Sequence, residues 1–266
     1  MIKVQTIKEM DKILELLIEQ KFDSGIQRFR SPYLYRGLSN QSYCLMTSLH
    51  RNCKNKQGYV EKPILRNFTK YATIEDSQLA ESIWRQLIIG QHHGLPTRLL
   101  DWTYSPLIGL HFATSEEDLA YMDQHDCILW KIDIEEINSL LPSEYKSVLF
   151  SEKAYLFTVD MLMALVNDLD KYDSDMGSSS MVLLEPPSID QRIINQYSYF
   201  SIIPKEVQNI EEFFNDNTFN TVKYIIDRNL RWKIRDMLDQ MGINERVVYP
   251  GLDGLSAWLK RHYYVK

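Results

Sequence analysis

The sequence predicts an α+β fold, with a mixed or antiparallel central sheet flanked by helices. Hydrophobic residues make up 44% of the 266-residue chain and charged residues 25%, as is typical of a globular protein with a sizeable core. Amphipathic helical segments and short alternating strand segments both occur, without the regular strand–helix succession of a parallel sheet. No apolar run approaches the roughly 20 residues that a membrane-spanning helix needs, so a membrane partner is not expected.

The expected helices follow from apolar residues repeated every three or four positions. The first covers residues 4–21, with Thr6 as its N-cap. Ser105 and Pro106 predict the start of a helix that runs to about Thr114, because Ser is a favoured N-cap and Pro fits the first helical position. The other helices are expected at 60–74, 75–93, 135–141, 159–169, 229–241 and 255–262.

The expected strands are short apolar or alternating segments bounded by turn residues. They are residues 33–36, 99–102, 127–134, 181–184, 192–203 and 221–227. The polar stretch 168–180, with Gly177 and three consecutive serines, predicts a surface loop.

The three cysteines, Cys44, Cys53 and Cys127, form no CxxC pair and are expected to be reduced thiols. The sequence also starts without the pattern of a signal peptide. We therefore expect a cytoplasmic protein of bacterial origin without disulfides. The net charge of −6 argues against extensive nucleic-acid binding, but a local basic cleft stays open.

The densest group of polar residues lies between Gln91 and Thr103. It contains two imidazoles, a guanidinium, a carboxylate and two hydroxyls, from His92, His93, Arg98, Asp101, Thr97 and Thr103. Adjacent histidines point about 100° apart on a helix, so we expect no metal ion here. The group is either an architectural network, with Arg98 paired to Asp101 or bracing a loop and the histidines as hydrogen-bonded core residues, or part of a binding site.

A second group is Tyr35-Arg36-Gly37, at the end of the expected strand 33–36. An arginine at the end of a buried strand needs a partner. Its planar fork suits a phosphate or carboxylate of a ligand, or an aspartate of the protein.

These two groups together resemble the FRG domain family, which is named for a Phe-Arg-Gly motif. Tyr35 stands where that motif has Phe, and the segment from Gln91 to Ala113 follows the family pattern Gln-His-x-Gly-Leu-Pro-Thr-Arg-Leu-Leu-Asp-Trp-Thr almost without gaps. The resemblance spans roughly residues 30–260. It implies an FRG-like domain in residues 30–266, preceded in residues 1–29 by the N-terminal helix that the apolar spacing predicts.

The Tyr-Arg-Gly strand is also similar, more loosely, to the first catalytic strand of Arg-Ser-Glu type ADP-ribosyltransferases. This similarity implies a sheet of that type, NAD as the cofactor, and ADP-ribosyl transfer or NAD cleavage as the activity. The third strand would be 191–200, where Gln196 replaces the glutamate; Glu185 is the nearest carboxylate on a preceding strand. The implied catalytic residues are Arg36, His92, His93, Glu185 and Gln196. The implied cofactor-binding residues are Arg36, Ser39, Thr97, Arg98, Asp101 and Thr103.

Three functions stay open on the sequence alone. The first is a nucleotide-handling enzyme, the second a non-catalytic module that binds a nucleotide or a nucleic-acid end, and the third an interaction protein. The first two require Arg36, one of the two histidines and Arg98 to line a single concave site. A carboxylate in that site favours the enzyme, whereas a closed Arg98–Asp101 pair without a pocket favours the interaction protein.

Overall fold

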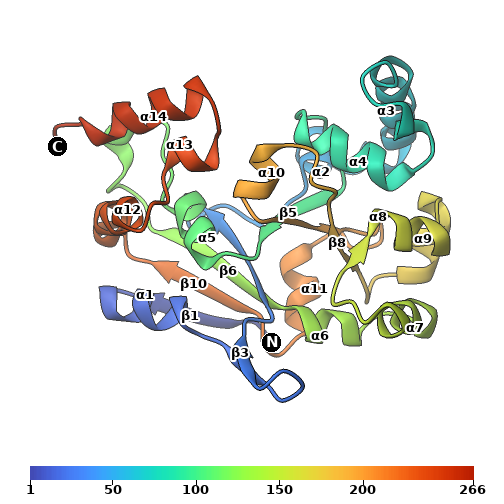
Figure 1. The fold of residues 1–266 in the computed structure, drawn as a ribbon, viewed down its shortest axis with the longest axis horizontal. Coiled ribbons are helices and arrows are strands. Elements are labelled where there is room, and N and C mark those ends of the chain that lie inside the picture. The colour runs from blue at the N-terminus through green and yellow to red at the C-terminus, as the bar shows by residue number, and fades with distance from the viewer.

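The computed structural model describes residues 1–266 and contains one eight-stranded mixed sheet surrounded by helices (Figure 1). Its strand order is β1-β10-β6-β4-β5-β9-β8-β7. The strands are β1 (Lys3–Ile7), β4 (Tyr33–Leu38), β5 (Leu99–Thr103), β6 (Cys127–Asp133), β7 (Phe157–Thr158), β8 (Val182–Glu185), β9 (Ser198–Ile202) and β10 (Val222–Ile226). The pairs β1–β10 and β7–β8 are parallel and all other neighbours are antiparallel, so the expected α+β class is confirmed.

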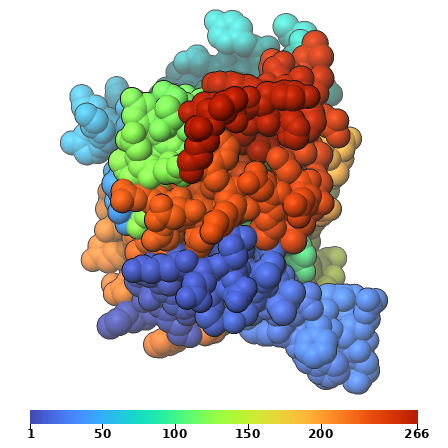
Figure 2. Space-filling view, turned by 90° about the vertical axis from the view of Figure 1, so that its left-hand side faces the viewer, coloured from blue at the N-terminus to red at the C-terminus, as the bar shows by residue number.

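The helices vary from one turn to more than four. They are α1 (Met10–Leu17), α2 (Ser48–Cys53), α3 (Gln57–Ala72), α4 (Ile83–His92), α5 (Pro106–Ala113), α6 (Ile134–Ser139), α7 (Ser143–Glu152), α8 (Val159–Leu165), α9 (Leu169–Met176), α10 (Gln191–Asn195), α11 (Ile210–Asn217), α12 (Arg231–Gln240), α13 (Glu245–Val248) and α14 (Leu252–His262). None of them has the length and apolar character that crossing a membrane requires. A separate hairpin of β2 (Lys21–Asp23) and β3 (Arg28–Arg30) projects from the body (Figure 2).

The core lies on both faces of the sheet, because side chains of successive strand residues point to opposite faces. Leu34 and Leu100 belong to a cluster with α6 and α11 on one face. Their neighbours Tyr35 and Leu99 belong to two clusters on the other face, one with α1, α5 and α12 and one with α4, α8 and α9. The central strands β4 and β5 are therefore held from both sides.

Several expected elements differ from the structure. The helix expected over 4–21 begins only at Met10, because residues 3–7 form β1 and pair with β10. The expected loop 168–180 contains α9, and the first part of the expected strand 192–203 is α10. The helix expected over 75–93 is interrupted, since α4 starts anew after Ser82, whose side chain accepts a hydrogen bond from the amide of Arg85.

Candidate functional site

A cleft opens in the middle of the sheet because β4 and β5 diverge. They share one register pair, Tyr35 with Thr103, whereas each pairs along its length with its other neighbour, β6 or β9. The space between them has a volume of about 350 Å³, within the range of small-molecule sites. We call it the Arg36 cleft. Its lining comes from β4 and the following loop, from β5, from Phe112 of α5, and from Arg192, Gln196 and Ser198 at the end of α10.

Arg36 stands at the opening between the two strands. Its Nη1 donates to the main-chain carbonyl of Asp101 at 2.6 Å and to the carboxylate Oδ2 of Asp101 at 3.3 Å. It thereby satisfies a carbonyl of β5 that has no partner in β4. The Nε atom is buried without a partner, and Nη2 makes no hydrogen bond to the protein. The guanidinium is fixed at one end and free to bind at the other.

The carboxylate of Asp101 is held by a short polar chain from α4. Gln91 donates from Nε2 to Oδ2 of Asp101 at 3.0 Å, and accepts at Oε1 from the hydroxyl of Thr97 at 2.6 Å. The Oδ1 atom of Asp101 makes no hydrogen bond to the protein, and 51% of the side chain is exposed. Asp101 therefore positions Arg36 and still presents one oxygen to the cleft.

The opposite wall comes from α10 and its C-terminal end. Arg192 projects from α10 over the ring of Tyr249, 5.4 Å from its centroid, and has no ion pair. Gln196 is fixed at two points: its main-chain carbonyl accepts from Thr103 Oγ1 at 2.7 Å, and its Nε2 donates to the carbonyl of Val248 at 3.1 Å. The Arg36 cleft thus contains two guanidinium groups and one carboxylate, a balance that favours an anionic ligand.

Gly37 lets α5 approach the cleft floor. A Cβ at this position would lie 2.2 Å from the main-chain nitrogen of Ala113 and 2.2 Å from the carbonyl oxygen of Gly109, both in α5. Only glycine allows this contact. Because α5 sits against β4, Phe112 of α5 reaches the cleft wall.

Residues 31–121 match the sequence model of the FRG domain family. The chain contains an FRG domain. The matched residues include β4, β5 and α5, so the FRG domain supplies the Arg36 side of the cleft, while Arg192 and Gln196 lie beyond it. No match was found among curated proteins or among solved structures.

The structure brings together five of the residues that the sequence singled out. Arg36, Ser39, Asp101, Thr103 and Gln196 all line the Arg36 cleft. The hydroxyl of Thr103 is used in the fold, because it donates to Gln196 and accepts from the amide of Ser105 at 3.1 Å. Gln196 stands at the end of α10 rather than on a strand, contrary to the sequence prediction.

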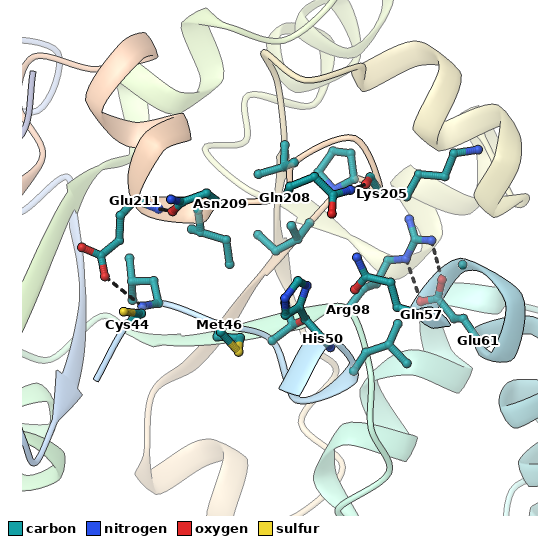
Figure 3. A pocket seen from close by; sticks show the side chains of 18 residues that line it. Cys44, Met46, His50, Gln57, Glu61, Arg98, Lys205, Gln208, Asn209 and Glu211 are labelled. Carbon is teal, nitrogen blue, oxygen red and sulfur yellow. Dashed lines mark hydrogen bonds and ion pairs between the residues drawn. The ribbon is translucent and has the colours of Figure 1, made fainter. Parts of the chain in front are cut away.

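The expectation that Arg98 and Arg36 line one site is wrong. Arg98, although part of the FRG motif, is buried and is absent from the lining of the Arg36 cleft. It borders a separate pocket, where Figure 3 shows its guanidinium paired with Glu61. Its Nε donates to Glu61 Oε1 at 2.7 Å and its Nη1 to Asp173 Oδ1 at 2.5 Å. Burial lowers the pKa of Arg98, but the two carboxylates outweigh this and raise it above its usual value. The alternative pairing with Asp101 is wrong too.

Both histidines and Thr97 lie outside the cleft lining. His92 Nε2 is 2.5 Å from Oδ2 of Asp190, the N-cap residue of α10, and the ring of His93 packs edge-on against His92. Thr97 is buried, and its amide donates to Ser48 Oγ at 3.0 Å. His92 thus joins α4 to α10, and Thr97 joins the segment before β5 to the first residue of α2, so these residues of the FRG motif hold the elements around the cleft together.

Glu185 is also remote from Arg36. It ends β8, which is separated from β5 by β9, and its side chain is exposed outside the cleft. Sequence reasoning missed Arg192, Tyr43 and Phe112. Asp190, an N-cap residue type one position before α10, was the available signal for a helix carrying Arg192. No group of three or more His, Cys, Asp or Glu side chains is arranged to hold a metal ion.

Proposed function

We propose that the FRG-containing chain binds a nucleotide in the Arg36 cleft, with NAD as the candidate ligand. The main support is the arrangement of two arginines across the cleft. Arg36 is hydrogen-bonded to the protein through Nη1 and not through Nη2, and Arg192 has no ion pair. Two guanidinium groups on opposite walls suit the two phosphates of a diphosphate. Three free cysteines support a cytoplasmic location for such a protein.

We further propose that the cleft cleaves NAD or transfers its ADP-ribose. In this reaction the bond between ribose and nicotinamide breaks, the electron pair leaves with nicotinamide, and water or an acceptor hydroxyl attacks the ribose carbon and loses a proton. The transition state carries positive charge on the sugar, as in glycoside hydrolysis. Asp101 is the one carboxylate in the cleft lining, so its Oδ1 is the candidate to stabilise that charge.

The second candidate is a binding module without catalysis. Gln196 occupies the position where the transferase resemblance implies a glutamate, and an amide cannot supply the negative charge. Its Nε2 is also engaged by the carbonyl of Val248. A binding module would use Arg36 and Arg192 in the same way and would need no carboxylate beside the ribose.

Two measurements test the proposal. Titration of NAD and ADP-ribose against the wild type should raise the melting temperature, and Arg36→Ala should abolish this shift. The control is Arg28→Ala, which removes an exposed arginine of the hairpin and should leave the shift intact. Nicotinamide release by the wild type and its loss in Asp101→Asn support the enzyme. Binding without release supports the module. An unchanged shift in Arg36→Ala, or no shift in the wild type, overturns the proposal.

A further inference from the structure

A second cavity of about 760 Å³ adjoins the Arg36 cleft. The two share Ser39, Tyr43 and Phe112 as lining residues, so they lie on either side of these three residues. We call it the C-terminal cavity, because α12, α14 and Tyr249 supply much of its wall.

The remaining wall is the segment that follows α5. Lys260 of α14 donates from Nζ to the carbonyl of Glu117 at 3.0 Å, which fixes this segment against the C-terminal helices. Figure 2 shows the two parts in contact, the segment in green and α14 in red. The cavity is therefore enclosed by parts of the chain distant in sequence.

The charges of the C-terminal cavity differ from those of the Arg36 cleft. Arg235 and Arg261 line it, but both donate to the carboxylate of Glu245, and Arg261 also donates to Asp239 at 2.7 and 2.8 Å. These guanidinium groups are neutralised within the protein. The carboxylate of Glu117 is exposed and has no partner. Lys260 is the one cation of the lining without a carboxylate partner, and the carboxylate of Glu117 presents an acceptor for hydroxyl or amino groups.

The ring surfaces lie where the two spaces meet. Phe112 and Tyr249 form an edge-to-face pair, with centroids 6.5 Å apart and planes at 78°. Arg192 also lies over the ring of Tyr249, so the arginine of the Arg36 cleft contacts the aromatic wall of the C-terminal cavity. An aromatic wall beside a free carboxylate suits a nucleoside, whose base stacks and whose ribose hydroxyls donate.

We infer that the C-terminal cavity binds one nucleoside of a dinucleotide whose diphosphate lies between Arg36 and Arg192. This inference rests on the proposed function, and it adds the place in the fold where one nucleoside of the ligand binds. A ligand that joins a nucleoside to a diphosphate fills both spaces, whereas free diphosphate fills the Arg36 cleft alone. The chain should consequently bind ADP-ribose and NAD more tightly than pyrophosphate.

Isothermal titration with ADP-ribose and with pyrophosphate separates the two spaces. Glu117→Gln and Tyr249→Leu should each weaken ADP-ribose binding about tenfold, the loss expected for one hydrogen bond to a charged group or one stacked ring. Glu117→Gln should leave pyrophosphate binding unchanged, whereas Tyr249→Leu also removes the ring that Arg192 contacts and is compared on ADP-ribose alone. The matched controls are Glu144→Gln and Tyr71→Leu, which change exposed residues outside both cavities. The melting temperature of each free variant shows whether it is folded.

The outcomes distinguish this inference from the function on which it rests. If pyrophosphate binding depends on Arg36 but ADP-ribose binds no tighter, or if both cavity variants bind ADP-ribose like their controls, the C-terminal cavity is not a nucleoside site while the Arg36 proposal stands. If neither ligand depends on Arg36, the proposed function itself fails.

Discussion

Replacing Arg98 with Met is expected to lower the free energy of unfolding by about 3–5 kcal/mol, because it leaves two buried carboxylates without their cation. Glu61 and Asp173 are 4% and 2% exposed. Glu61 accepts hydrogen bonds from Nε and Nη2 of Arg98 and from no other donor. Asp173 keeps only the amide of Lys205, at 3.1 Å. Methionine fills a similar volume, so the loss measures the broken ion pairs more than a cavity.

The matched control for Arg98→Met is Lys62→Met. Lys62 pairs with Asp170 and joins the same two helices, α3 and α9, but 54% and 64% of these side chains are exposed. Solvent screens such a pair, so its loss should lower the free energy of unfolding far less than the loss of Arg98. Urea denaturation with linear extrapolation measures both values. Adding Glu61→Gln to Arg98→Met should restore part of the stability, because a neutral amide is cheaper to bury. If Arg98→Met costs no more than Lys62→Met, the reasoning on the buried pairs is refuted.

Three further predictions address packing, acid stability and thiol reactivity. Gly37→Ala should destabilise the fold strongly because of its clash with α5, whereas Gly58→Ala, whose Cβ meets nothing within 4 Å, should gain up to about 1 kcal/mol; equal effects in urea would contradict this packing. Burial, and then a neighbouring arginine, lower the pKa of His111, so only the unfolded chain gains its proton. The free energy of unfolding should therefore fall by about 1.4 kcal/mol for each pH unit below pH 6.5. His111→Asn should remove this dependence of stability on pH, and an unaltered dependence would exclude His111 as its source. Burial raises the pKa of Cys127 to about 12, so a thiol reagent should label Cys44 in the folded protein and Cys127 only in urea, and native labelling of Cys127 would disprove its burial.

Elements defined by local contacts were predictable from the sequence. The side chain of Ser105 accepts from the amide of Ile108, and Pro106 occupies the first turn of α5, as expected from residue type alone. The strand β1 was not predictable in this way. Four of its five residues are exposed, and its pairing with β10 joins segments more than 200 residues apart, for which a local pattern has no signal.

The helix α9 shows how a buried charge misleads sequence analysis. Its inward residues Leu169, Tyr172, Asp173 and Met176 repeat at helical spacing. One of them is an aspartate, so it adds to the polar composition that, with Gly177 and the three serines, indicated a loop. Asp173 is buried only because Arg98, 75 residues earlier, neutralises it.

One of the two walls of the candidate site was predictable from the sequence. The motifs around Arg36 and Asp101 identified one wall of the cleft, because both belong to the FRG pattern. The other wall depends on β9 pairing with β5, which brings Arg192 and Gln196 opposite them.

The divergence of β4 and β5 bears on how this protein can be dissected. Within residues 31–121 these two strands touch at one register pair, and their full-length neighbours β6 and β9 come from residues 127–133 and 198–202. A fragment cut at the borders of the family match would keep the motif but expose both strands along their hydrogen-bonding edges. The family match is therefore shorter than the part of the chain that completes the sheet. A protein fragment made for expression should include β6 and β9 as well as the matched residues.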